Sequence, residues 1–158
     1  DKREEKRINK VLKRTSVKIK DFDSKYPISI ERNPNDNLGM AKYIEDAMFF
    51  EDFDVISNKV VAEIKSIDNP LNTENKNIEI QRYLEYTTVF VVEITYQSMP
   101  VLARCSEAIS SFQAKIVDIA NEGLLVGTFR FQGNALTYVE CPETVAAAFV
   151  RALKNNML

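Results

Sequence analysis

The apolar positions of this chain are densest between residues 87 and 131. Residues 87–96, TTVFVVEITY, carry β-branched and aromatic side chains at nearly every position, and residues 112–119 alternate more regularly. Residues 124–131 follow the turn sequence Asn-Glu-Gly, in which Gly123 can supply the positive φ of a short hairpin loop. The pattern predicts three consecutive antiparallel strands, of which the first is central and covered on both faces.

Two segments repeat their apolar residues at helical spacing. The first covers residues 38–49, where Asp36 or Asn37 can cap the helix, and its apolar stripe is expected to end in a group of phenylalanines: Phe49, Phe50 and Phe53. The second covers residues 143–155, where Pro142 occupies the first turn. Both stripes predict helices that pack one face on the sheet.

Shorter segments complete the expected order of elements. Residues 16–22 alternate as a strand, and residues 26–30 extend it irregularly. Residues 53–57 predict a short strand, followed by a helix that begins at Ser57 or Asn58. Residues 68–77 read as a polar loop, and 78–86 as either a short helix or an approach to the next strand. We therefore expect an α/β (α+β) fold with a single mixed sheet, a C-terminal antiparallel meander and helices packed on it, in the order β-α-β-α-β-β-β-α.

The charge of the chain is concentrated at its start. Residues 1–14 contain seven of the 21 Lys and Arg residues but three of the 23 Asp and Glu residues, so the remainder is acidic. Ile8, Val11 and Leu12 have helical spacing, yet neighbouring like charges oppose a helix in isolation. We interpret residues 1–15 as a charged N-terminal arm or linker, solvated and frayed, and residues 16–158 as one α/β domain. The acidic body gives no reason to expect nucleic-acid binding.

The absence of histidine restricts the chemistry. Among 158 residues there is none, which excludes Ser-His-Asp and Cys-His catalysis and zinc sites with histidine ligands. There is no Gly-x-Gly motif or phosphate-binding loop. Tyr83, Tyr86 and Tyr96 flank the central strand, and we interpret them as packing residues rather than a ligand-stacking set. We identify no catalytic, cofactor-binding or metal-ligating residue and expect no cofactor.

One weak enzymatic pattern remains as an alternative. Glu63 and Lys65 form an acid-x-Lys pair, and Asp54 lies upstream. In many metal-dependent nucleases such a pair lies on a strand, where carboxylates hold Mg²⁺ and the lysine positions water. The segment here has the pattern of a helix, and an exposed helical surface is the interpretation we favour. The acidic groups 45–46 and 51–54 likewise read as a solvated face.

Two motifs resemble a family of bacterial cell-envelope domains. Residues 37–47, NLGMAKYIEDA, followed by 53–57, FDVIS, resemble the helix-then-strand unit of the TolB N-terminal domain, of CsgG and of LpoB-type activators. The strand pair 112–118 and 122–127 and the closing helix are similar to the same family, so the resemblance spans about residues 16–153. It implies a non-enzymatic α/β domain of the cell envelope, often on a lipoprotein. We do not extend it to pore formation, because the segment 68–88 is short and polar.

The resemblance sets our functional expectation. We expect a cell-envelope interaction or assembly module, periplasmic or outer-membrane-associated, which includes the soluble part of a lipoprotein. Its partner would be an envelope protein or a second copy of the chain. The chain begins with Asp1, so we expect a processed product whose membrane tether would lie in an absent N-terminal segment. The metal-dependent nuclease built on Asp54, Glu63 and Lys65 is the alternative.

The two cysteines are expected at one end of the sheet. Cys105 follows the first strand of the meander, and Cys141 follows the third, which runs in the same direction. Neighbouring loops need not bring the two Cα atoms within about 4.4 to 6.8 Å, the range for a disulfide. An exported protein would permit the bond and a reducing compartment would not. The sequence leaves both a disulfide and two free thiols open.

Overall fold

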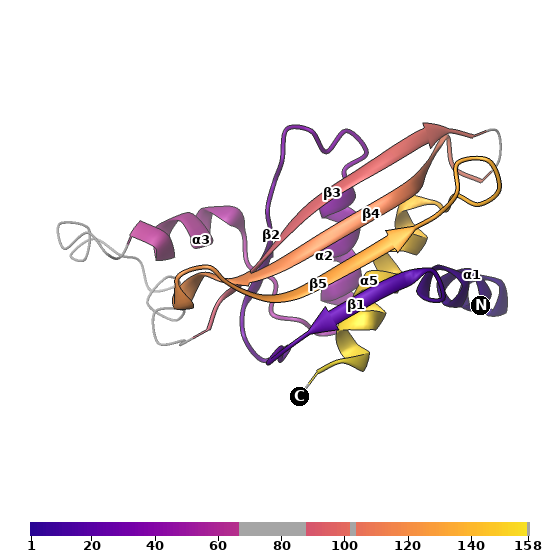
Figure 1. Cartoon of the computed structure of the whole chain (residues 1–158). Helices are drawn as coiled ribbons and strands as arrows, with labels where there is room; N and C mark the ends of the chain where they lie inside the picture. Colours follow the sequence, from indigo (N-terminus) through magenta and orange to yellow (C-terminus); the bar gives the residue numbers. More distant parts are fainter. Residues whose placement is uncertain (67–87, 102–103, 158) are drawn as a thin grey trace.

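The computed structural model describes residues 1–66, 88–101 and 104–157. They form the predicted α+β fold on a single mixed sheet (Figure 1). The sheet has five strands in the order β1-β5-β4-β3-β2. The strands are β1 (Thr15–Ile19), β2 (Ile28–Ile30), β3 (Phe90–Pro100), β4 (Glu107–Asp118) and β5 (Leu124–Gln132). The helices are α1 (Lys2–Leu12), α2 (Met40–Phe50), α3 (Asn58–Lys65), α5 (Pro142–Asn155) and the short 3-10 turn η3 (Ile119–Asn121).

The predicted meander forms the centre of the sheet. Strands β3, β4 and β5 pair antiparallel in succession, with Val92 opposite Ile116 and Ala114 opposite Phe129. The loop between β4 and β5 contains Gly123 at φ +75°, which confirms its expected role in the turn. These pairings bring the most apolar stretches of the sequence together in the middle of the sheet.

The two short N-terminal strands lie on opposite edges of the sheet. Strand β1 pairs antiparallel with β5, and β2 pairs parallel with β3, so residues 26–30 do not extend the first strand as expected. The connection between them buries Phe22, whose ring centroid lies 5.0 Å from that of Phe90 and 6.1 Å from that of Phe53. The buried ring holds the connection against the core while the chain crosses from one edge to the other.

The predicted strand over residues 53–57 is reduced to one bridge. Val55 pairs with Ile28 in parallel, and Ile28 exchanges backbone hydrogen bonds of 2.9 Å with Asp54 and Ile56 on either side. Ser57 then accepts a hydrogen bond from the amide of Val60 and caps α3. The helix begins before a second ladder pair can form, so the expectation of a strand here was wrong.

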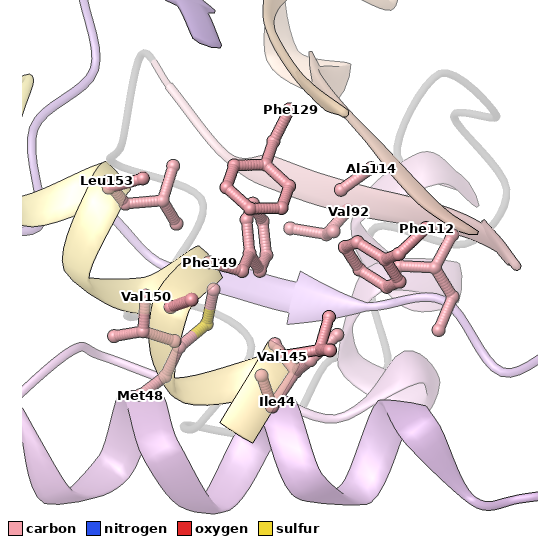
Figure 2. Close-up of a cluster of buried hydrophobic side chains, with 14 of the residues drawn as sticks. Ile44, Met48, Val92, Phe112, Ala114, Phe129, Val145, Phe149, Val150 and Leu153 are labelled. Carbon is pink, nitrogen blue, oxygen red and sulfur yellow. The ribbon is translucent and has the colours of Figure 1, made fainter. Parts of the chain in front are cut away.

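The main core lies between the sheet and the pair of helices α2 and α5. Figure 2 shows Ile44 and Met48 of α2 and the α5 side chains facing Val92, Phe112, Ala114 and Phe129 of the sheet. Phe149 is fully buried, and its ring centroid lies 5.2 Å from that of Phe129 and 5.9 Å from that of Phe112. The buried side chains of the central strands and α5 include Phe90, Val92, Ile94, Ile116, Val126 and Phe149, in agreement with the predicted strands and helix.

Among the described residues, the opposite face of the sheet is covered at one end, by α3. There α3 packs Val61 against Val89 and Val91, with Ile56 in the same small cluster. Further along β3, Glu93 and Thr95 are exposed. The expectation that the first meander strand is covered on both faces therefore holds only for its beginning, because α3 has just eight residues and does not reach farther.

The N-terminal segment differs from the expected frayed arm. Residues 2–12 form α1, which packs beside α5 and buries Ile8 and Val11 in the main core. The apolar spacing was therefore the decisive signal, because burial of that stripe outweighs the repulsion between neighbouring like charges. The interpretations of 68–77 as a loop and of 78–86, including Tyr83 and Tyr86, concern residues outside those described.

Candidate functional site

A hollow with a partly apolar wall lies between α2 and α5. It has a volume of about 680 Å³, and its walls come from both helices: Tyr43, Asp46, Ala47, Phe50 and Glu51 on α2 and the residue after it, and Glu143, Ala147, Val150, Arg151, Lys154 and Asn155 on α5. Apart from the buried Val150, these residues lie on sides of the two helices other than the stripes that enter the core. We refer to this hollow as the α2–α5 groove.

The end of α2 exposes two adjacent aromatic side chains. Phe49 is 77% exposed and Phe50 is 85% exposed, whereas Phe53 is buried. The sequence predicted that the apolar stripe of the helix ends in these three phenylalanines, but Phe49 and Phe50 lie outside the buried stripe. Met48 occupies the core position, and each further residue turns about 100° around the helix, so the next two side chains point outward. Exposed apolar side chains gathered at a groove are typical of a contact surface.

The two sides of the α2–α5 groove differ in charge. Asp46 and Glu51 lie on the α2 side, whereas α5 contributes Arg151 and Lys154 together with one acidic residue, Glu143. Lys154 Nζ lies 2.6 Å from a carboxylate oxygen of Glu51 across the groove. Arg151 forms two hydrogen bonds with Glu5 of α1, at 2.6 and 2.8 Å, and this contact raises the pKa of the guanidinium and lowers that of the carboxyl group. The groove is thus apolar at its aromatic side and charged at its rim.

The residues of the nuclease alternative do not line the α2–α5 groove. Glu63 and Lys65 are on α3, so the acid-x-Lys pair lies on a helix, as favoured, and not on a strand. Asp54 precedes that helix, where its backbone oxygen accepts from Ile28. Among the described ranges 1–66, 88–101 and 104–157, there is no group of three or more Asp, Glu, His or Cys side chains that could hold a metal ion.

Tyr96 has a structural contact that the sequence does not show. Its hydroxyl donates to Asp36 at 2.5 Å and accepts from the amide of Leu38 at 3.0 Å. The same carboxylate accepts from the first amides of α2, Met40 and Ala41, at 2.7 and 2.9 Å. Asp36 therefore satisfies the helix amides as predicted, although Gly39 occupies the N-cap position. Burial, followed by the hydrogen bond to Asp36, raises the pKa of Tyr96 to about 12.

The structure joins the two cysteines. Cys105 in the loop between β3 and β4 and Cys141 at the start of α5 form a disulfide, with their Cα atoms 6.0 Å apart. Both lie at one end of the sheet, as the direction of the strands predicted. The sequence could not choose between the bond and two free thiols, because the distance depends on how the two loops fold toward each other.

A buried carboxylate beside the disulfide was not found from the sequence. Glu140 is 3% exposed, and its Oε1 accepts from Arg7 of α1 at 2.6 Å and from the amide of Cys141 at 2.9 Å. Its hydrogen bond raises the pKa of the Arg7 guanidinium. The two residues lie 133 positions apart. No local spacing could have indicated their contact, because it exists only once α1 docks.

Comparison with known proteins returns a resemblance among solved structures. No family model matches the chain, and no curated protein matches it. Two similar structures are a methionine-substituted variant of the PelC dodecamer and the PelC dodecamer itself, both from Paraburkholderia phytofirmans, with TM-scores of 0.46 and 0.48. Their sequence identities are 10% and 9%, over 88% of this chain and 95% and 96% of theirs. We rest no functional argument on this likeness. Within the described residues, no helix is both long and apolar enough to cross a membrane.

Proposed function

We propose that this chain is a non-enzymatic interaction or assembly module of the bacterial cell envelope, and that it associates through the α2–α5 groove. The observation that carries the proposal is the exposure of Phe50 in the wall of that groove, next to the exposed Phe49 in the sequence. Aromatic side chains bury a large area when they dock, and they are enriched in the centres of protein interfaces. Two neighbouring phenylalanines in solvent are costly unless a partner covers them for part of the time.

The occupant that fits the groove is a second copy of the chain. An interface with twofold symmetry uses the same patch on both subunits, so the patch must be complementary to itself. The α2 side carries Asp46 and Glu51, and the α5 side carries two cations, Arg151 and Lys154, against one acidic residue, Glu143. Both cations pair within the chain, with Glu5 and Glu51, at exposed positions where a second copy can exchange these partners. A twofold axis along the groove sets the acidic side of one copy against the basic side of the other. Charges of opposite sign at a rim favour such a register.

The disulfide supports an envelope location for the module. Disulfides persist in exported proteins and are rare in reducing compartments. The bond between Cys105 and Cys141 therefore agrees with a periplasmic or outer-membrane-associated protein. In this proposal the chain is the soluble part of a lipoprotein or of a similarly tethered protein. The resemblance of residues 16–153 to TolB N-terminal, CsgG and LpoB-type domains points to the same setting.

Sedimentation of matched variants tests the proposed association. Analytical ultracentrifugation from micromolar to millimolar concentration is expected to show reversible self-association of the unaltered protein. Phe50→Ser is expected to raise the dissociation constant of this self-association by roughly tenfold or more, which corresponds to about 1.4 kcal/mol. Leu124→Ser is the control, because Leu124 is also an exposed apolar residue but lies at the β4–β5 hairpin. A monomer at every concentration, or equal effects of the two variants, would overturn association through this groove.

A further inference from the structure

Helix α1 presents three chemically different sides to the rest of the protein. Ile8 and Val11 enter the core. Glu4 and Glu5 contact α5, where they accept from Thr144 at 3.1 Å and from Arg151. The third side is basic, because Arg7, Lys10 and Arg14 recur at helical spacing and extend just past the end of the helix. Each side has its own neighbour in the fold, and the basic one faces residues 135–140 (Figure 1).

Within residues 1–66, 88–101 and 104–157, the first of these basic side chains has acidic partners and the other two have none. Arg7 is neutralised by Glu140, with which it forms hydrogen bonds of 2.6 and 3.2 Å. Lys10 Nζ instead lies 4.4 Å from the centre of the Tyr138 ring, and the Arg14 guanidinium carbon lies 4.8 Å from it. In the part of the chain that the structure describes, neither cation forms an ion pair. The ring holds both positive charges near each other without cancelling them.

A further cation lines the hollow in front of this ring. The hollow measures about 390 Å³ and is lined by Arg7, Lys10, Arg104 and residues 135–140. Arg104 is exposed, precedes the disulfide and likewise has no ion pair with any described residue. The one carboxylate in the lining is Glu140, which is buried and already engaged by Arg7. The hollow therefore carries an uncompensated positive charge in a protein whose net charge is −2.

We propose that this hollow binds a phosphate group, with Lys10 and Arg104 as its direct ligands. Like charges held close together repel, and a multiply charged anion between them removes that cost. An arginine fork and a lysine ammonium are the side chains that most often hold phosphate oxygens. Arg14, whose guanidinium also lies over the Tyr138 ring, adds positive potential nearby. Arg7 acts as a positioning residue, because its pairing with Glu140 fixes α1 against the segment that forms the other wall.

The phosphate can belong to a free phosphate ester or to a lipid headgroup. Leu136 lies at the mouth of the hollow and is 94% exposed, so an apolar side chain stands next to the cations. A small ester would use the hollow alone, whereas a lipid would also place its apolar part near Leu136. Both sources share the same phosphate chemistry, and the two arms of one experiment separate them.

The experiment compares two double variants of equal net charge. Lys10→Gln/Arg104→Gln removes the proposed ligands, and Lys42→Gln/Lys59→Gln removes two exposed lysines on α2 and α3. One arm titrates inorganic phosphate and follows the backbone amides of residues 135–140 by NMR. The other arm measures co-sedimentation with phosphatidylcholine vesicles that contain or lack phosphatidylglycerol. Circular dichroism and thermal melting confirm that both variants fold, which their exposed positions favour.

The expected result is saturable binding by the unaltered protein that the first double variant weakens by roughly tenfold or more, because two charged contacts are lost. The control variant is expected to change the binding affinity by less than about twofold, because its lysines are far from the hollow and their charges are screened by salt. If Lys10→Gln/Arg104→Gln loses binding of inorganic phosphate, the ligand is a free phosphate ester. If it loses binding only to the vesicles, the ligand is a lipid headgroup. No binding by the unaltered protein, or equal weakening by both variants, would overturn the site.

Discussion

Arg7 and Glu140 join the N-terminal helix to the segment that precedes the C-terminal helix. Arg7 Nη2 lies 2.6 Å from Glu140 Oε1, although the two residues are 133 positions apart. The carboxylate also accepts from the amide of Cys141 at 2.9 Å, and its other oxygen accepts from the Tyr138 hydroxyl at 3.4 Å. One buried side chain therefore fixes α1, the start of α5 and the disulfide relative to one another.

The pair predicts unequal costs for its two truncations. Arg7→Met leaves the Glu140 carboxylate buried without a cation, so we expect a loss of about 3 kcal/mol in the free energy of unfolding. Glu140→Gln leaves Arg7 without its carboxylate partner, but Arg7 lies nearer the surface and can be solvated. We therefore expect a smaller loss in the free energy of unfolding, of about 1 to 2 kcal/mol. Urea denaturation of both variants measures the difference. A larger loss for Glu140→Gln than for Arg7→Met would contradict this account of the pair.

Reduction of the disulfide is expected to destabilise the fold without abolishing it. The bond closes a separation of 36 residues, which corresponds to about 4 kcal/mol in the chain-entropy description. Thermal melting with and without a reductant measures the effect. The double variant Cys105→Ser/Cys141→Ser should melt at the temperature of the reduced protein, and its melting temperature should not change when a reductant is added. A thiol assay on unreduced, denatured protein made under oxidising conditions should find no free thiol. Two titratable thiols would count against both the bond and the envelope location.

Truncation of a buried and of an exposed phenylalanine is expected to change the free energy of unfolding by different amounts. Phe149→Ala is expected to cost about 3 to 5 kcal/mol, because it opens a cavity between the rings of Phe112 and Phe129. Phe49→Ala is its matched control and should change the unfolding free energy of the monomer by less than about 0.5 kcal/mol, since the side chain is in solvent. Equal costs would mean that α2 and α5 are packed differently from the structure.

Alkaline pH is expected to destabilise the protein through two tyrosines. Burial is the main cause that raises the pKa of Tyr96 and of Tyr138 from 10.0 to about 12, and Asp36 and Glu140 contribute. The unfolded phenols ionise near 10 while the folded ones keep their protons, so the folded state binds more protons between these values. The contribution is fully present below pH 10 and is lost as the pH rises to about 12.

Unfolding curves collected across that pH range test whether the free energy of unfolding falls as the pH rises. Tyr96→Phe should lower the unfolding free energy below pH 10 and flatten the decline above it, because the variant has no proton to lose there. Tyr138→Phe should flatten it in the same way. A decline of unchanged slope in the double variant Tyr96→Phe/Tyr138→Phe would assign the alkaline effect to other groups.

The nuclease alternative gives a direct activity test. We expect no cleavage of DNA or RNA with Mg²⁺ or Mn²⁺, because Glu63 and Lys65 lie on a helix and the described residues hold no cluster of three acidic groups. The measurement is a cleavage assay with the unaltered protein and with Glu63→Ala. Metal-dependent cleavage that disappears in the variant would reverse the assignment.

Local pattern determined most of the fold of this protein. The β-branched run in β3, the alternation of β4 and the turn at Gly123 predicted the meander, because side-chain burial follows the period of a strand. The apolar stripes of α2 and α5 predicted the helices and the face each one buries, for the same reason. The direction of the strands also placed both cysteines at one end of the sheet.

Tertiary structure decided the features that depend on distant partners. Residues 2–12 carry an apolar stripe, but only the surface of α5 and the carboxylate of Glu140 make a docked helix out of a charged segment. Likewise, the buried Phe22 anchors the connection between β1 and β2, which lie on opposite edges of the sheet. Phe50 points away from the core because of its position around α2. Periodicity fixes which side of an element is apolar, whereas the free energy of docking depends on what covers that side, and that partner lies far away in the sequence.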